Sequence, residues 1–204
     1  MSAAERVYAQ IKEEILGGAL PGGALLSEGE VAKRLAVSRT PAREAFVRLA
    51  AEDLLSLLPR RGAVVTPLSS AVDLLETRHA LETSAVARLA RLADRERRLA
   101  GARAALEAQL EAGDVAAFVA ADERFHLELV RASGNELAAG FYATLGDRQR
   151  RMTTQAINLD AALLSALAPE HRGLLELAEA GGSEAFSKAL WEHLRNTHAA
   201  LAGL

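Results

Sequence analysis

Apolar residues recur every four positions near the start of the chain, at Val7, Ile11 and Ile15. An α-helix turns once in 3.6 residues, so this spacing places the three side chains on one face and predicts a helix over residues 5–17. The glycine pair that follows, Gly17-Gly18, favours the end of this helix. We therefore expect the first segment to pack one apolar face against a core.

Two more helices and a β-hairpin are predicted before residue 66. Ser27 followed by Glu30 is typical of a capping box, which marks a helix N-terminus. A longer helix follows, and then two short apolar runs flank a basic turn that contains Gly62, as in a hairpin. We expect these elements at residues 30–35, 39–52, 54–58 and 63–65. Three short helices followed by a hairpin are typical of a winged helix-turn-helix domain.

From residue 71 onward the pattern is helical throughout, after a break that the proline and serines of residues 66–70 favour. Helices are expected at residues 71–92, 95–112, 114–132, 135–158, 160–180 and 183–202. The predicted fold is therefore mainly α. It has a winged helix-turn-helix domain over residues 1–68 and an all-α helical bundle over residues 69–204.

Composition agrees with a helical fold and excludes several kinds of chemistry. Half of the residues are hydrophobic and only 4% are aromatic, which favours helices over strands. The chain has no cysteine, and this excludes disulfides, thiolate metal sites and cysteine nucleophiles. Charged residues between Glu5 and Glu14 interrupt the first segment, so it is unlike a signal peptide. No charge-free apolar run is long enough to cross a bilayer, so we expect a soluble, cytoplasmic protein.

Positive charge is concentrated in one stretch, although the net charge of the chain is −3. Residues 33–61 hold seven basic and three acidic side chains, a balance of +4, which leaves −7 for the remainder. A basic segment on an acidic body fits a protein that meets a polyanion such as DNA with one part of its surface.

The predicted helix over residues 39–52 has the features of a DNA-recognition helix. Arg39 and Arg43 lie four residues apart and therefore share one face. Arginine pairs well with guanine edges in the major groove, which such a helix reads with its N-terminal residues. Ser38 and Thr40 are suited to contact phosphates or to cap the helix, and Pro41 costs no hydrogen bond in the first turn.

The segment from Leu26 to Gly62, with VSRTPAREA at residues 37–45, resembles the N-terminal domain of GntR-family regulators, in particular the FadR-type branch. The resemblance covers roughly residues 5–66 and implies a wing that enters the minor groove. Gly29 stands where many relatives have an arginine, and Asp53 replaces their turn glycine. The DNA-binding residues are expected to be Ser38, Arg39, Thr40, Arg43, Arg48, Arg61 and Gly62.

One recognition helix covers too few base pairs to specify a site alone. Two-fold symmetry doubles the site, so we expect a homodimer on a palindromic double-stranded DNA operator. The expected function is that of a transcriptional regulator, more specifically a repressor, and not of an enzyme.

Four residues of the helical part form a candidate metal site. Asp122 and His126 are four residues apart on one predicted helix, so both can bind one ion. His171 and His193 lie on two later helices, and antiparallel packing can bring them to the first pair. Three imidazoles and one carboxylate suit Zn²⁺, with Ni²⁺ and Mn²⁺ as alternatives, and leave positions open for a ligand.

The same residues resemble the metal-binding subset of FCD domains, the C-terminal domains of FadR-type regulators. The resemblance covers about residues 70–203, and all four ligand positions of its pattern are filled. It implies a small organic acid as effector, bound through the metal and an arginine. Arg78, Arg148 and Asn135 are the expected effector-binding residues, although Arg78 can also form an i, i+4 salt bridge with Glu82.

Two alternatives to the sensor stay open. The ion can be purely structural, or the chain can be a helical metal-dependent hydrolase. A hydrolase needs a general base beside the metal. Glu123 and Glu170 adjoin ligands in sequence but are expected to point elsewhere. His79 precedes the metal motif by too many helices to be placed, and His198 is expected at the surface because it lies off the face of His193.

Overall fold

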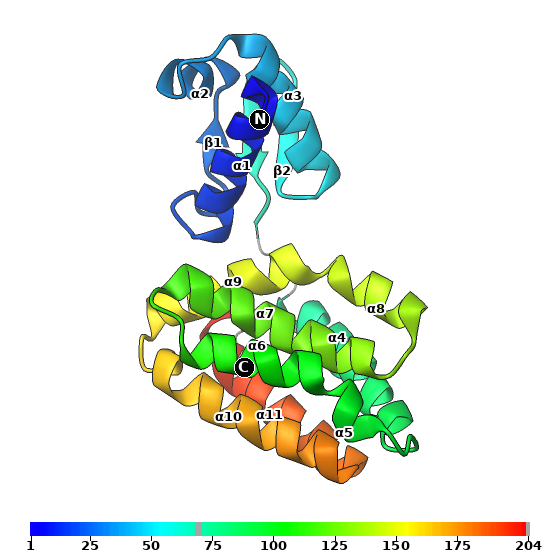
Figure 1. The fold of residues 1–204 in the computed structure, drawn as a ribbon. Helices are drawn as coiled ribbons and strands as arrows, with labels where there is room; N and C mark the ends of the chain where they lie inside the picture. Colours follow the sequence, from blue (N-terminus) through cyan, green and yellow to red (C-terminus); the bar gives the residue numbers. More distant parts are fainter. Residues whose placement is uncertain (68–70, 203–204) are drawn as a thin grey trace. The chain divides into compact units, whose positions relative to one another are not determined.

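A computed structural model describes residues 1–67 and 71–202. The chain forms two compact units, Met1–Ser69 and Ser70–Leu204 (Figure 1). The predicted boundary between residues 68 and 69 lies outside the described residues. Each unit has a core of its own, so each is described by itself.

The N-terminal unit contains three helices and a small antiparallel sheet with the strand order β1-β3-β2. Its elements are α1 (Ala3–Leu16), β1 (Leu25–Leu26), α2 (Glu28–Arg34), α3 (Arg39–Ala51), β2 (Leu55–Leu58) and β3 (Gly62–Val65). The predicted winged helix-turn-helix is confirmed, and the predicted helices and hairpin are found within a few residues of their expected bounds. Strand β1 was not predicted, because two residues are too short to show an alternating pattern.

The core of this unit forms where the predicted apolar face of α1 meets α3. Val7 and Ile11 of α1 and Phe46 and Leu49 of α3 are fully buried. A capping box at Ser2 starts α1, since the Ser2 hydroxyl accepts from the Glu5 amide and the Glu5 carboxylate accepts from the Ser2 amide. Burial of each such side chain contributes about 1.5–3 kcal/mol, so this helix pair anchors the unit.

The hairpin turn requires glycine at one position. Gly62 has φ of +99°, a conformation that side chains rarely adopt, and a Cβ atom there would overlap the carbonyl oxygen of Leu26. The close approach follows from the pairing of β1 with β3. Asp53, which replaces a turn glycine, has φ of 59°, as its tolerance of the left-handed region predicts.

Within the described residues, the regular elements of the C-terminal unit are all helices. They are α4 (Ala71–Leu89), α5 (Arg95–Arg98), α6 (Ala100–Leu110), α7 (Val115–Ala132), α8 (Glu136–Ala143), α9 (Gly146–Leu159), α10 (Leu163–Ala180) and α11 (Ser183–Ala202). The prediction of single helices over residues 95–112 and 135–158 was wrong. The chain breaks at Leu99 and at Leu145, and each break buries that leucine. At the second break the Phe141 carbonyl accepts from both the amide and the hydroxyl of Thr144.

Helix α7 lies in the middle of this unit, packed on α4, α6, α8 and α9, while α11 packs on α4, α9 and α10 (Figure 1). The arrangement brings one face of α7 opposite the inner faces of α10 and α11. Within the described ranges, no helix has the length and apolar character needed to cross a membrane.

Candidate nucleic-acid interface and candidate metal centre

A basic groove lies between α3 and the β2–β3 wing. Its volume is about 600 Å³. The charged residues that line it are four arginines and one glutamate, namely Arg39, Arg43, Arg60, Arg61 and Glu28. Arg39, Arg43 and Val47 are spaced four residues apart on α3, so one helical face supplies this wall of the groove. The arginines are exposed, so their guanidinium groups remain available to a phosphate or a base edge.

The start of α3 exposes the two hydroxyl side chains that were expected to contact DNA. Ser38 occupies the N-cap position, but its hydroxyl makes no capping hydrogen bond, and Thr40 is also exposed. The first-turn amides of a helix lack intrahelical partners and carry partial positive charge. The side chains and the amides at this end are therefore suited to hold a phosphate.

The glycine that departs from the family pattern lies against a recognition-helix arginine. A Cβ atom at Gly29 would lie 3.6 Å from both Nε and Nη2 of Arg39, an ordinary contact distance. The Arg39 side chain therefore passes over the backbone of α2. A longer side chain at position 29 would compete with Arg39 for this part of the groove.

The structure brings together Arg39, Arg43, Arg61 and Gly62 of the predicted DNA-binding set, but not Arg48. Arg48 leaves α3 on another side, where its guanidinium lies over the Tyr8 ring at 3.9 Å from the centroid. Glu52 on the same side accepts hydrogen bonds from Tyr8 and Lys12. Arg48 thus lies beside a polar cluster between α1 and α3.

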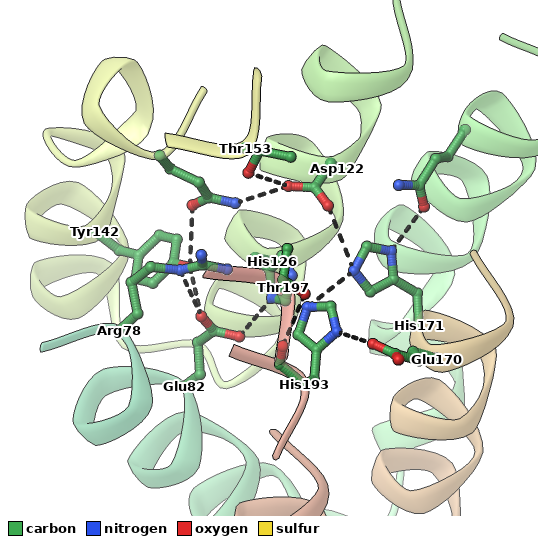
Figure 2. Close-up of polar contacts among 12 residues, drawn as sticks. Arg78, Glu82, Asp122, His126, Tyr142, Thr153, Glu170, His171, His193 and Thr197 are labelled. Carbon is green, nitrogen blue, oxygen red and sulfur yellow. Dashed lines mark hydrogen bonds and ion pairs between the residues drawn. The ribbon is translucent and has the colours of Figure 1, made fainter. Parts of the chain in front are cut away.

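The three predicted histidines converge in the C-terminal unit (Figure 2). One nitrogen from each of His126, His171 and His193 lies within 4.8 Å of the others, and all three side chains are buried. The Nε2 atoms of His171 and His193 are 3.3 Å apart, and Oδ1 of Asp122 is 3.5 Å from Nε2 of His171. We refer to the three histidines as the triad. They come from α7, α10 and α11.

Each histidine of the triad uses its second ring nitrogen to bond an oxygen. Nδ1 of His126 lies 2.7 Å from Glu82 Oε2, Nδ1 of His171 lies 2.7 Å from Gln109 Oε1, and Nδ1 of His193 lies 2.6 Å from Glu170 Oε2. These oxygens accept, so each Nδ1 donates and carries the ring hydrogen. In the neutral rings, the three Nε2 atoms are therefore the ones with free lone pairs. This outer set of oxygens is typical of metal-ligating histidines.

The arrangement fits a divalent cation. Two lone pairs that face each other at 3.3 Å repel, and Nε2 of His126 is buried with no hydrogen-bond partner in the part of the chain that the structure describes. Burial and the Arg78 charge lower the pKa of His126 well below its ordinary value, and burial does the same to the pKa of His171. Both rings are therefore neutral at pH 7. A cation among the three Nε2 atoms and Asp122 would satisfy all of these atoms at once.

A second buried network adjoins the triad through Glu82. Tyr142 donates to Glu82 Oε1 at 2.6 Å, and Nε of Arg78 lies 3.2 Å from the Tyr142 hydroxyl and 3.4 Å from Glu82 (Figure 2). Burial raises the pKa of Glu82, while the Arg78 charge acts in the opposite direction. Asp122 is held from the other side, because Gln149 and Thr153 donate to its Oδ2. Nη2 of Arg78 is buried and has no hydrogen-bond partner among the described residues.

The predicted effector-binding residues are not all in this region. Arg78 is buried beside Glu82, and the i, i+4 salt bridge between them is present. Arg148 is exposed on α9, and Asn135 is exposed at the start of α8, where its side chain caps the helix by accepting from the Ala138 amide. Of these three residues, only Arg78 joins the network around the triad.

Two expectations about neighbouring residues were wrong. His198 is buried, 1% exposed, because α11 packs on α4, α9 and α10 and so buries more than one of its faces. Glu170 does not point away from the cluster, because its carboxylate reaches across from α10 to His193 on α11. His79, which could not be placed, donates from Nε2 to the Ser187 carbonyl, and its ring lies edge-on to Trp191.

Sequence reasoning missed most of the polar residues that support the triad. Gln109 carried a signal, since it extends the apolar stripe Ala102, Ala105 and Leu106 of α6, where a polar residue needs a buried partner. Tyr142, Gln149 and Thr153 carried none, because single polar residues in helices are common at surfaces.

Comparison with known proteins agrees with this division into two units. Residues 3–65 match the model of bacterial regulatory proteins, gntR family, and residues 73–196 match the FCD domain. The chain is 34% identical over 197 residues to a probable D-xylose utilization operon transcriptional repressor of Paenarthrobacter nicotinovorans, which covers 95% of this chain and 86% of that protein. It is 28% identical over 203 residues to the HTH-type transcriptional repressor RspR of Escherichia coli K12, covering 94% and 85%.

A solved structure shows the same fold. Escherichia coli McbR/YncC superposes with a TM-score of 0.73 over 100% of this chain and 98% of that chain, at 24% sequence identity. The matching families and the relatives are transcriptional regulators and not enzymes, so the hydrolase alternative is set aside.

Proposed function

This chain belongs to the GntR family of bacterial regulatory proteins and carries an FCD domain, so it is a DNA-binding transcriptional regulator, and we propose that it is a metal-dependent repressor released from DNA by a small carboxylate. The observation that carries the proposal is the convergence of three lone-pair nitrogens on one buried point. Asp122 completes the ligand set, and Zn²⁺ is the ion that three imidazoles and a carboxylate suit best. When bound, the ion would act as a Lewis acid that attracts an anionic oxygen.

The charges around the triad support an anionic effector. Arg78, Glu82 and Asp122 are each at most 3% exposed, and with all three ionised they carry one net negative charge. A divalent ion changes this balance to one positive charge. An isolated charge is costly in a buried site, so a carboxylate that enters the site stabilises it. The unpartnered Nη2 of Arg78 is a donor available to a second oxygen of the acid.

The DNA-reading surface is proposed to be the basic groove and the start of α3. Arg39 and Arg43 would read base edges, Ser38 and Thr40 would hold phosphates, and the wing with Arg61 and Gly62 would follow the adjacent groove. A single α3 covers few base pairs, so the proposed active form is a homodimer on a palindromic operator. The two relatives that are named repressors support repression over activation.

Helix α4 is the element that can connect the two functions. It carries Arg78 and Glu82, and it begins at Ala71, four residues after Pro67 of the N-terminal unit. A carboxylate held by both the ion and Arg78 favours one packing of α4 against α7, α10 and α11. The resulting change in operator affinity cannot exceed the difference in the acid's affinity for the two packings.

The test is an operator titration by fluorescence anisotropy, with a duplex selected from a random library. The metal-loaded protein is titrated with and without di- and tricarboxylates and sugar acids, and the series is repeated after chelation. We expect one class of acid to weaken operator binding at least tenfold, a coupling of about 1.4 kcal/mol, in the loaded protein alone. An acid that releases DNA equally well from chelated protein would show that the ion is not part of the sensor.

A purely structural ion is the second candidate function of the triad. It is favoured by the position of the triad, which joins three helices of the bundle. It predicts that chelation lowers the melting temperature while no acid changes operator affinity. The two candidates are therefore separated by the same titration.

A further inference from the structure

The hydrogen bonds that hold the triad from outside differ in their protection from water. Glu82 and Gln109, which accept from His126 and His171, are buried at 0% and 1% exposure. Glu170, which accepts from His193, has a side chain that is 38% exposed. One of the three outer hydrogen bonds therefore lies at the surface of the unit.

The two carboxylate acceptors, Glu82 and Glu170, also differ in how firmly they are held. Glu82 is fixed by Tyr142 and by Arg78 in addition to His126. Glu170 has no second hydrogen bond or ion pair within the described ranges of the chain. Glutamate loses rotamer freedom when it is held in one place, so a single exposed contact gives way to water more readily than a buried network.

The backbone beside Glu170 is weakened by the preceding residue. Pro169 lies inside α10 and has no amide hydrogen, so the carbonyl of Ser165 lacks its usual intrahelical donor. The first turns of α10 are therefore held by fewer backbone hydrogen bonds than the rest of the helix. Glu170 and His171 both follow this turn, but the His171 ring is also held by stacking on Phe125.

From these contrasts we propose that Glu170 is a positioning residue, and that it makes His193 the ligand through which the metal ion enters and leaves the triad. The proposal rests on the proposed metal-binding function and adds a route to it. While the Glu170 carboxylate accepts from Nδ1, the His193 ring is fixed with Nε2 toward its partners. When water replaces that carboxylate, the His193 ring can rotate. His126 and His171 stay oriented by their buried acceptors.

Two substitutions at Glu170 separate orientation from charge. Glu170→Ala removes the acceptor, whereas Glu170→Gln keeps an acceptor oxygen without the charge, as Gln109 does for His171. Glu192 provides the matched control, because it is an exposed glutamate next to His193 with no hydrogen bond to the triad among the described residues. The full-length protein is loaded with Zn²⁺. The rate of zinc loss to a chromophoric chelator is then measured, together with the zinc dissociation constant.

We expect Glu170→Ala to weaken zinc binding and to speed zinc loss by about 10- to 100-fold, which is the usual effect of removing an outer partner. Glu170→Gln should fall between this variant and the parent, and Glu192→Ala should match the parent. The chelated forms should melt at the same temperature, since an exposed contact contributes little to stability. Equal rates of zinc loss from parent and Glu170→Ala would overturn the inference. A parent that holds no zinc would instead overturn the proposed function.

Discussion

The guanidinium of Arg48 stacks on the Tyr8 ring, while Arg39 on the same helix faces the basic groove. Nine residues separate the two arginines, about two and a half turns of α-helix, so their side chains leave α3 on opposite sides. The arginines of α3 therefore lie in two different environments in this chain. One side of α3 is available to DNA, and the other binds α1.

The first prediction follows from that division. Arg39→Ala and Arg43→Ala should each weaken binding to the selected operator by about 1–3 kcal/mol, roughly 5- to 150-fold, and relax its sequence preference. Arg48→Ala should leave affinity nearly unchanged and lower the melting temperature slightly, because an exposed cation–π contact contributes about 0.5–1 kcal/mol. Anisotropy titrations and thermal melts measure both effects. If Arg48→Ala weakened binding as much as Arg43→Ala, DNA would contact the opposite side of the helix as well.

The wing offers a second prediction, at Gly62. Gly62→Ala should destabilise the N-terminal unit and reduce operator binding, because the new Cβ atom overlaps the Leu26 carbonyl and the residue has φ of +99°. Gly23→Ala is the matched control, since Gly23 has φ of +86° but open space around a Cβ atom. Chemical denaturation of the two variants isolates the overlap from the strain. Equal losses of stability would mean that strain alone explains the glycine.

Metal content gives the third prediction. The purified protein should hold about one divalent ion per chain, and removal by chelator should lower its melting temperature because the ion binds only the native state. A variant with His126, His171 and His193 all changed to alanine should hold none in elemental analysis. His79→Ala should retain the full amount, since His79 contacts Ser187 and Trp191 instead. Stoichiometric metal in the triple variant would contradict the site.

The fourth prediction concerns acid and the buried His198. In the folded protein, burial lowers the pKa of His198 well below its ordinary value of 6.5. At a pH between the pKa of the folded state and 6.5, the unfolded chain therefore binds a proton that the folded chain does not. This contribution to stability is complete above pH 6.5 and is lost as the pH falls below that value. Chelated His198→Phe should therefore lose less stability than the chelated parent between pH 7.5 and 5.5. If the melting temperatures of the two proteins fell equally between pH 7.5 and 5.5, His198 would not be the residue that binds the proton on unfolding.

The fold could be predicted because each unit expresses one strong periodic pattern. The spacing of Val7, Ile11 and Ile15 predicts their helix, and all three side chains are buried. The breaks at Leu99 and Leu145 could not be predicted, because leucine favours helix in its own right and only the packing of the whole bundle shows that each leucine gains burial at a bend. Strand β1 is defined by its partner β3 and not by its own two residues.

Spacing and family resemblance predicted the four candidate ligands but not the residues that support them. Asp122 with His126 is a pair within one helix, so its geometry follows from helix periodicity. The hydrogen bond between Glu170 and His193 joins two helices. The local sequence does not show which turn of α10 faces α11, so this contact could not be predicted. Residues such as Tyr142, which completes the network from 60 positions away, become visible only when the tertiary structure is known.

The origin of the triad on three helices also has a consequence for the order of folding. His126 and His171 are 45 positions apart, and His171 and His193 are 22 apart, so an unfolded chain must close two long loops to gather the nitrogens. Closing such loops costs chain entropy. Contacts between the helices must offset this cost before the nitrogens can come together. Capture of the proposed ion would therefore be a late step of assembly in this molecule. A newly made chain would bind the proposed ion only after its helical bundle has formed, so bound metal would mark a fully folded chain.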